Sequence, residues 1–218
     1  MSWRDHTWPT ETVRPRSTKR AVVLAGLMIG WGLAVSTGLM VLSIYENLPG
    51  LAATAPLSWP VASGIGRTRG LPTLIMLVHP HCPCSRANIE ELNRLMAQAH
   101  ETMSVYVLFL KPSDVPEDWE LTDLWRSAAA IPGVHAMRDE GGVEAARFQA
   151  ATSGQVVLYD AAGRLLFSGG ITSARGHEGD NVGSDTILSL LTRGRADDSS
   201  TPVFGCSLRE VRAGGSWP

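Results

Sequence analysis

The chain has 218 residues, a formal net charge of −2 and 44% hydrophobic residues. This length suits one domain with additional segments rather than two full domains. The nearly balanced charge lacks the basic footprint of a nucleic-acid-binding protein, so we expect no nucleic-acid partner. Three cysteines exclude a disulfide-dense scaffold, and their odd number leaves at least one thiol free, metal-bound or paired between chains.

An apolar segment near the N-terminus predicts a membrane anchor. Residues 21–44 contain no charged side chain, and a helix of this length spans about 36 Å, enough to cross a hydrocarbon core of about 30 Å. Basic residues dominate the charges of residues 1–20, whereas the first charged residue after the segment is Glu46. The positive-inside rule therefore predicts a cytoplasmic tail, one transmembrane helix in a bacterial inner membrane, and a periplasmic domain.

A cleaved signal peptide is the alternative interpretation of this segment. Ala53, Thr54 and Ala55 form a candidate cleavage motif. Pro56 at the first mature position and the length of the apolar run favour an uncleaved anchor instead. Both interpretations export the rest of the chain to a compartment in which disulfides persist.

The exported part begins with a predicted linker and continues as an α/β pattern. Residues 45–70 are rich in Pro, Gly, Ala and Ser, which is typical of a linker that lifts a domain off the membrane. The following pattern predicts strands at 71–78, 103–110, 155–159 and 164–168, and helices at 85–99, 119–130, 142–151 and 184–192, the last with Ser184 as its N-cap.

This order predicts one compact domain over residues 71–193. The first two strands are joined through a helix and should be parallel, whereas the last two should form an antiparallel hairpin. The fold class is therefore a mixed central sheet flanked by helices. Residues 194–218 remain as a C-terminal extension that carries Cys206.

The chemistry is concentrated in the sequence HPHCPCSR, where the first strand ends and a helix begins. A thiol at the N-terminus of a helix is exposed to the helix dipole and to unpaired N–H groups, both of which stabilise a thiolate. The pKa of Cys82 should therefore lie below the ordinary value of about 8.5. A thiolate is the nucleophile in disulfide exchange, so Cys82 is the candidate nucleophile.

The motif and the order of elements resemble the thioredoxin superfamily, in particular its membrane-anchored, TlpA- and ResA-like thiol–disulfide branch; they are also similar to RedB-type proteins. The resemblance covers residues 71–193. It places Cys82 on the nucleophilic cysteine of the family motif W-C-P-P-C-R-A-E, and Arg86 and Ala87 on the R-A pair after the motif's second cysteine. It implies a thioredoxin-like fold and redox exchange with thiol- or disulfide-bearing proteins or small thiols, without an organic cofactor.

The same resemblance implies a set of residues that contact the substrate. They surround the nucleophile or lie in the loop before the third strand: His81, Pro83, Ser85, Ser153 and Gly154. The sequence departs from the family at three of these positions. Ser85 occupies the place of the second cysteine, His81 that of the tryptophan, and Gly154 that of the cis-proline.

Several alternatives remain open at this point. Either Cys84 or Cys206 could resolve a disulfide formed by Cys82. A binding and delivery site for copper or another soft metal is an alternative, with Cys82, Cys84, His79 and His177 as its ligands. A thioredoxin-like module that serves only protein interaction is a third. Residues 175–181 are interpreted as a solvated turn, and Trp119 as a core residue.

Overall fold

The computed structural model describes residues 18–51, 53–99 and 101–208, and it divides into two units, residues 1–44 and 45–218. Helix α1, Thr18–Asn47, contains the apolar segment, and none of its side chains is buried. It is long and apolar enough to cross a membrane, although a signal sequence passes the same test. The predicted span 21–44 lies within this helix.

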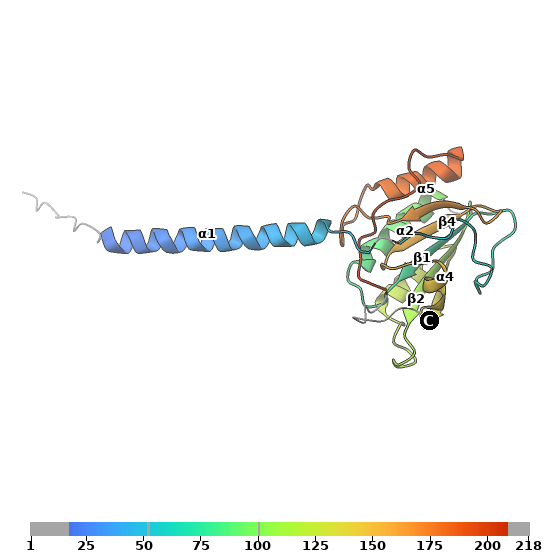
Figure 1. Ribbon diagram of the computed structural model, residues 1–218, viewed down its shortest axis with the longest axis horizontal. Helices are drawn as coiled ribbons and strands as arrows, with labels where there is room; N and C mark the ends of the chain where they lie inside the picture. The colour runs from blue at the N-terminus through green and yellow to red at the C-terminus, as the bar shows by residue number, and fades with distance from the viewer. Residues whose placement is uncertain (1–17, 52, 100, 209–218) are drawn as a thin grey trace, which may run out of the picture. The chain divides into compact units, whose positions relative to one another are not determined.

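The second unit is built on a five-stranded sheet with the order β3-β2-β1-β4-β5 (Figure 1). The strands are β1 (Thr73–Val78), β2 (Ser104–Lys111), β3 (Val134–Glu140), β4 (Gln155–Tyr159) and β5 (Leu165–Gly169). Strands β1, β2 and β3 are parallel to one another, whereas β4 and β5 form an antiparallel hairpin on the other side of β1. This arrangement confirms the predicted mixed sheet.

Helices cover both faces of the sheet and bury two apolar clusters. Helices α2 (Ser85–Ala99), α3 (Asp123–Ala129) and α5 (Val182–Arg193) pack on one face, and α4 (Val143–Arg147) lies on the other. Every side chain of β1 is buried, as its uninterrupted apolar run predicts for a central strand covered on both faces. The central strand thereby fixes the position of the turn that follows it, which carries Cys82.

Four local expectations need correction. Strand β3 was not expected, because its sequence VHAMRDE is polar; it forms by pairing with β2 at the edge of the sheet. The helices expected at 119–130 and 142–151 are limited to α3 and α4. The N-cap of α5 is Asn181, whose side chain accepts a hydrogen bond from the Ser184 N–H, so Ser184 is not the cap.

The segments on either side of residues 71–193 pack against the domain. The stretch expected as a linker buries Ala55 and Ile65 in the cluster of α4, and Trp59 contacts Phe148 and Tyr159 edge to face. The backbone of this stretch pairs with the hairpin at Leu165 N–H to Leu57 O, 2.9 Å, and at Trp59 N–H to Gly163 O, 2.8 Å. It therefore forms a layer on the sheet rather than a free spacer.

Candidate functional site

Cys82 lies in the tight turn between β1 and α2, three residues before the helix begins. Its carbonyl accepts a hydrogen bond from the Ser85 N–H at 3.0 Å, and its own N–H donates to the His79 carbonyl at 3.1 Å. These bonds hold the turn at the N-terminus of α2, where free N–H groups favour a negative charge. The Cys82 side chain is only 1% exposed.

The second thiol at the site comes from the C-terminal extension. The Sγ atoms of Cys82 and Cys206 are 2.9 Å apart, and the Cys206 N–H points to the Cys82 Sγ at 3.4 Å. All three cysteines are free thiols. A separation of 124 residues along the chain carries no distance information, so the sequence could not predict this contact.

The two thiols differ in acidity. Burial raises the pKa of Cys82, but hydrogen bonds from the Cys206 thiol, the Ser85 hydroxyl and the N–H groups of Cys206 and Cys84 outweigh it, so this pKa falls below its ordinary value. Burial, together with the hydrogen bond to Cys82 and the negative charge there, raises the pKa of Cys206 to about 12. Of the two thiols, Cys82 is therefore the more acidic and ionises first, whereas Cys206 retains its proton.

Cys84 is buried beside this pair but is less suited to react. Burial and the charge on Cys82 raise the pKa of the Cys84 thiol, and the Arg175 guanidinium lowers it only in part. Arg175 also donates to the Gly205 carbonyl at 2.5 Å and to the Leu48 carbonyl at 3.2 Å. The interpretation of residues 175–181 as a solvated turn thus missed Arg175, because a lone arginine in a Gly-rich stretch gives no signal of a site.

Two serines connect the cysteine turn to the loop before β4. The hydroxyls of Ser85 and Ser153 are 2.8 Å apart, and Ser153 Oγ also accepts from the His79 N–H at 2.8 Å. Gly154 follows in the left-handed region, with φ +87°, and an added Cβ would lie 2.6 Å from the Asn88 side chain. Glycine is therefore required at this position, and the loop lies against α2.

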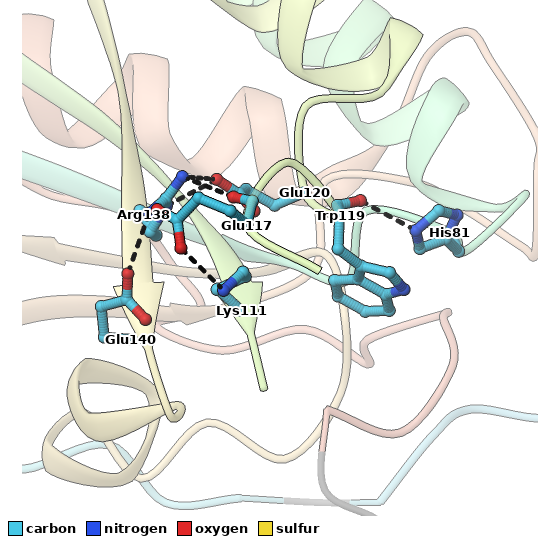
Figure 2. A network of polar contacts seen from close by, with 7 residues as sticks. All are labelled: His81, Lys111, Glu117, Trp119, Glu120, Arg138 and Glu140. Atoms are coloured by element: carbon cyan, nitrogen blue, oxygen red, sulfur yellow. Dashed lines mark hydrogen bonds and ion pairs between the residues drawn. The ribbon is translucent and has the colours of Figure 1, made fainter. Parts of the chain in front are cut away.

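An aromatic wall borders the exposed side of the turn. The His81 Nε2 lies 3.0 Å from the Trp119 carbonyl (Figure 2). The centroid of the Trp119 ring lies 5.4 Å from that of His79 and 4.5 Å from that of His81. Trp119 is half-buried at the site, not in the core as expected. Burial and the nearby His81 lower the pKa of His79, so His79 is neutral at pH 7.

Ion pairs between basic side chains of the sheet and glutamates stabilise the loop that carries Trp119. Arg138 on β3 donates to the carboxylates of Glu117, Glu120 and Glu140 at 2.6, 2.5 and 3.2 Å, and Lys111 lies 3.9 Å from Glu117 (Figure 2). Glu120 is fully buried. The unexpected strand β3 therefore anchors the wall of the site.

The other predicted site residues have mixed outcomes. Pro83 and His81 are exposed, whereas Ser85 and Ser153 are buried. His177 is also exposed, and within the described part of the chain no group of three or more His, Cys, Asp or Glu side chains is arranged to hold a metal ion. The copper ligands Cys82, Cys84, His79 and His177 are thus not assembled into a metal site.

Comparisons with known proteins identify the fold. No family model and no curated protein matches the chain. A hypothetical protein from Sinorhizobium meliloti is similar in structure, with TM-score 0.57, 18% identity, and coverage of 72% of this chain and 96% of that one. An uncharacterised conserved protein from Geobacillus kaustophilus has TM-score 0.55 and 22% identity, with coverage of 75% and 94%.

A thioredoxin lipoprotein from Streptococcus pneumoniae is a more distant match, with TM-score 0.44, 14% identity, and coverage of 65% of this chain and 99% of that one. At these identities a structural likeness establishes only the fold. The sheet order, the parallel crossover and the terminal hairpin agree with the expected architecture. The second unit has a thioredoxin-like fold.

Proposed function

We propose that the protein is a membrane-anchored, extracytoplasmic thiol–disulfide exchange protein with Cys82 as nucleophile and Cys206 as resolving thiol. The observation that carries this proposal is the 2.9 Å contact between the two Sγ atoms, one an acidic thiol and the other a proton-holding one. The thioredoxin-like fold, with the thiol at the end of β1, supports it.

The exchange proceeds in two steps. The Cys82 thiolate attacks a disulfide RS–SR′, forms Cys82–SR, and releases R′S⁻, which takes a proton from solvent. Cys206 then loses its proton and attacks the Cys82 Sγ, which forms the Cys82–Cys206 disulfide and releases RS⁻. The protein gives up two electrons and the substrate accepts them; an external dithiol reverses both steps.

The charges at the site favour this order of events. While Cys82 is a thiolate, its charge and its hydrogen bond contribute to the high pKa of Cys206. The mixed disulfide at Cys82 has no charge, so both contributions disappear and the pKa of Cys206 falls. The resolving thiol thus becomes reactive only after the nucleophile has bound a substrate.

Trapping experiments test the assignment of the resolving thiol. We expect the Cys206→Ser variant to accumulate a mixed disulfide on Cys82 when the reduced protein meets oxidised glutathione. The Cys84→Ser variant should instead form the Cys82–Cys206 disulfide as the unaltered chain does. Mixed-disulfide accumulation in the Cys84 variant alone would assign resolution to Cys84 and contradict the proposal.

The location of the protein is the second part of the proposal. Helix α1 is fully exposed in its unit and follows a basic N-terminal stretch, which supports an inner-membrane anchor with a cytoplasmic N-terminus and a periplasmic domain. We expect the full-length chain to stay in the membrane after alkaline extraction, and an alkaline phosphatase fused to its C-terminus to be active. A soluble product that begins at Pro56 would show cleavage instead.

A further inference from the structure

The C-terminal extension is hydrogen-bonded to the domain and packs closely against it. We call residues Ser199–Leu208 the strap. Its backbone follows the edge of β5, with the Ser168 N–H donating to the Ser199 carbonyl at 3.0 Å, and the Thr201 hydroxyl donates to the Gly170 carbonyl at 2.7 Å. The strap comes after α5 at the red end of the chain (Figure 1).

Glycines allow the strap to approach the domain closely. An added Cβ at Gly169 would lie 2.5 Å from the Thr201 backbone nitrogen, and one at Gly170 would lie 2.6 Å from the Pro202 carbonyl oxygen. On the strap itself, a Cβ at Gly205 would lie 2.0 Å from the Ser153 carbonyl oxygen. Side chains at these glycine positions would push the strap and the domain apart.

The end of the strap pairs with the loop that faces Cys82. Thr152 and Ser207 form an antiparallel bridge; the Ser153 N–H donates to the Cys206 carbonyl at 2.8 Å, and the Leu208 N–H donates to the Ala151 carbonyl at 2.9 Å. Cys206 is thus positioned next to Cys82 by a segment whose backbone is hydrogen-bonded to this loop. A substrate segment that paired with this loop would compete with Cys206 for the N–H of Ser153.

The segment that follows α1 holds the strap from the other side. The Gly50 N–H donates to the Val203 carbonyl at 2.8 Å, and the Thr152 hydroxyl donates to the Leu51 carbonyl at 3.1 Å. Arg175 joins the two layers through its bonds to the carbonyls of Gly205 and Leu48. Two segments of the chain, the strap and the residues after α1, therefore pack together next to the thiol pair.

We propose that the strap is an internal substrate mimic that gates Cys82, and that an extended, disulfide-bearing segment of a protein substrate reaches Cys82 by displacing it. This inference rests on the proposed function, because it takes Cys82 as the nucleophile. It predicts local opening: the strap separates from the loop at Ser153 while the sheet stays folded. Because the contact of Gly205 with Ser153 leaves no room for a Cβ, the substrate residue before the reacting cysteine should be glycine.

The rate at which Cys82 is alkylated tests the gate. The full-length protein in detergent is kept reduced, exposed to iodoacetamide, and digested for mass spectrometry. The rate is measured at alkaline pH, where loss of the Cys206 hydrogen bonds no longer limits ionisation of Cys82. There we expect Gly205→Ala, which displaces the strap, to raise the Cys82 labelling rate by about tenfold. Gly66→Ala is the matched control, because nothing lies within 4 Å of its added Cβ and the rate should not change.

A second measurement on the unaltered protein covers the case in which Gly205→Ala fails to fold. Hydrogen exchange is compared at the amides of Ser153 and of Met76, which is fully buried in β1. If the strap gates Cys82, the Ser153 amide should exchange and Cys82 should react through a local opening. The Met76 amide should stay protected from exchange during that opening. Equal labelling in Gly205→Ala and Gly66→Ala, or Cys82 reactivity only through global unfolding, would overturn the proposal.

These outcomes are distinct from those of the exchange reaction itself. Labelling is measured on the reduced chain and needs no disulfide, so a protein without exchange activity could still show the gate. Conversely, a Cys82–Cys206 disulfide that forms normally while Cys82 is equally accessible in all variants would keep the proposed function and remove the gate.

Discussion

At the residue scale, the central feature is the difference in acidity between two neighbouring thiols, Cys82 and Cys206. We predict a thiolate titration, followed by ultraviolet absorbance, in which one thiolate forms below the ordinary thiol pKa and belongs to Cys82. Because the folded pKa of Cys82 is lowered, its thiolate persists as pH falls toward that value. Cys206, whose pKa is raised to about 12, should stay protonated until the pH approaches that value. Equal titration of both thiols would contradict this account.

The hydroxyl of Ser85 provides a second test at this scale. Ser85 donates to the Cys82 Sγ and lowers the pKa of that thiol. Ser85→Ala should therefore shift the pH dependence of Cys82 alkylation upward, because the thiolate loses a donor. Ser113→Ala, at an exposed serine after β2, serves as the control and should leave the profile unchanged. A profile that Ser85→Ala does not shift would remove this residue from the site.

At the scale of the elements, the start of α5 depends on Asn181. Its side-chain oxygen accepts from the Ser184 N–H at 2.8 Å, and its Nδ2 donates to the buried Glu91 carboxylate at 3.2 Å. Asn181→Ala should lower the free energy of unfolding by about 1–2 kcal/mol in a urea titration. Ser184→Ala should cost little, because the Ser184 hydroxyl has no hydrogen-bond partner. Similar losses in both variants would contradict the assignment of the cap.

Elements with strong local patterns were predictable from the sequence, whereas those made by distant contacts were not. The apolar run of β1 and the one-sided pattern of α2 identified both elements, and α2 has the predicted bounds. Strand β3 lacks such a pattern. Its Arg138 is hydrogen-bonded to three glutamates, two of which precede the strand while the third belongs to it. Strand β3 forms because it pairs with β2, and this pairing cannot be read from the sequence of β3 alone.

The site was predictable to the same extent. The position of Cys82 between strand and helix is local, and the sequence predicts both its place and its acidity. The choice between Cys84 and Cys206 depends on how the chain returns after α5, along the glycines at 169 and 170 and across Ser153. Only the folded chain contains that information, and the same holds for Arg175.

At the scale of the whole molecule, the strap closes a long loop when its thiol bonds to Cys82. Oxidation should raise the free energy of unfolding by up to about 5 kcal/mol, because a cross-link over a loop of this length restricts the unfolded chain. Thermal or denaturant unfolding with and without dithiothreitol measures the difference. Cys84→Ser should keep this difference and Cys206→Ser should abolish it. A difference that persists in Cys206→Ser would assign the stabilising bond to another pair.

The most direct test of the central claim is to map the disulfide in the full-length protein purified in air. Free thiols are alkylated without reductant, and the digest is analysed by mass spectrometry before and after dithiothreitol. The account predicts a Cys82–Cys206 disulfide, reversible by dithiothreitol, with Cys84 alkylated from the start. A Cys82–Cys84 disulfide, or three free thiols after exposure to oxidised glutathione, would contradict it.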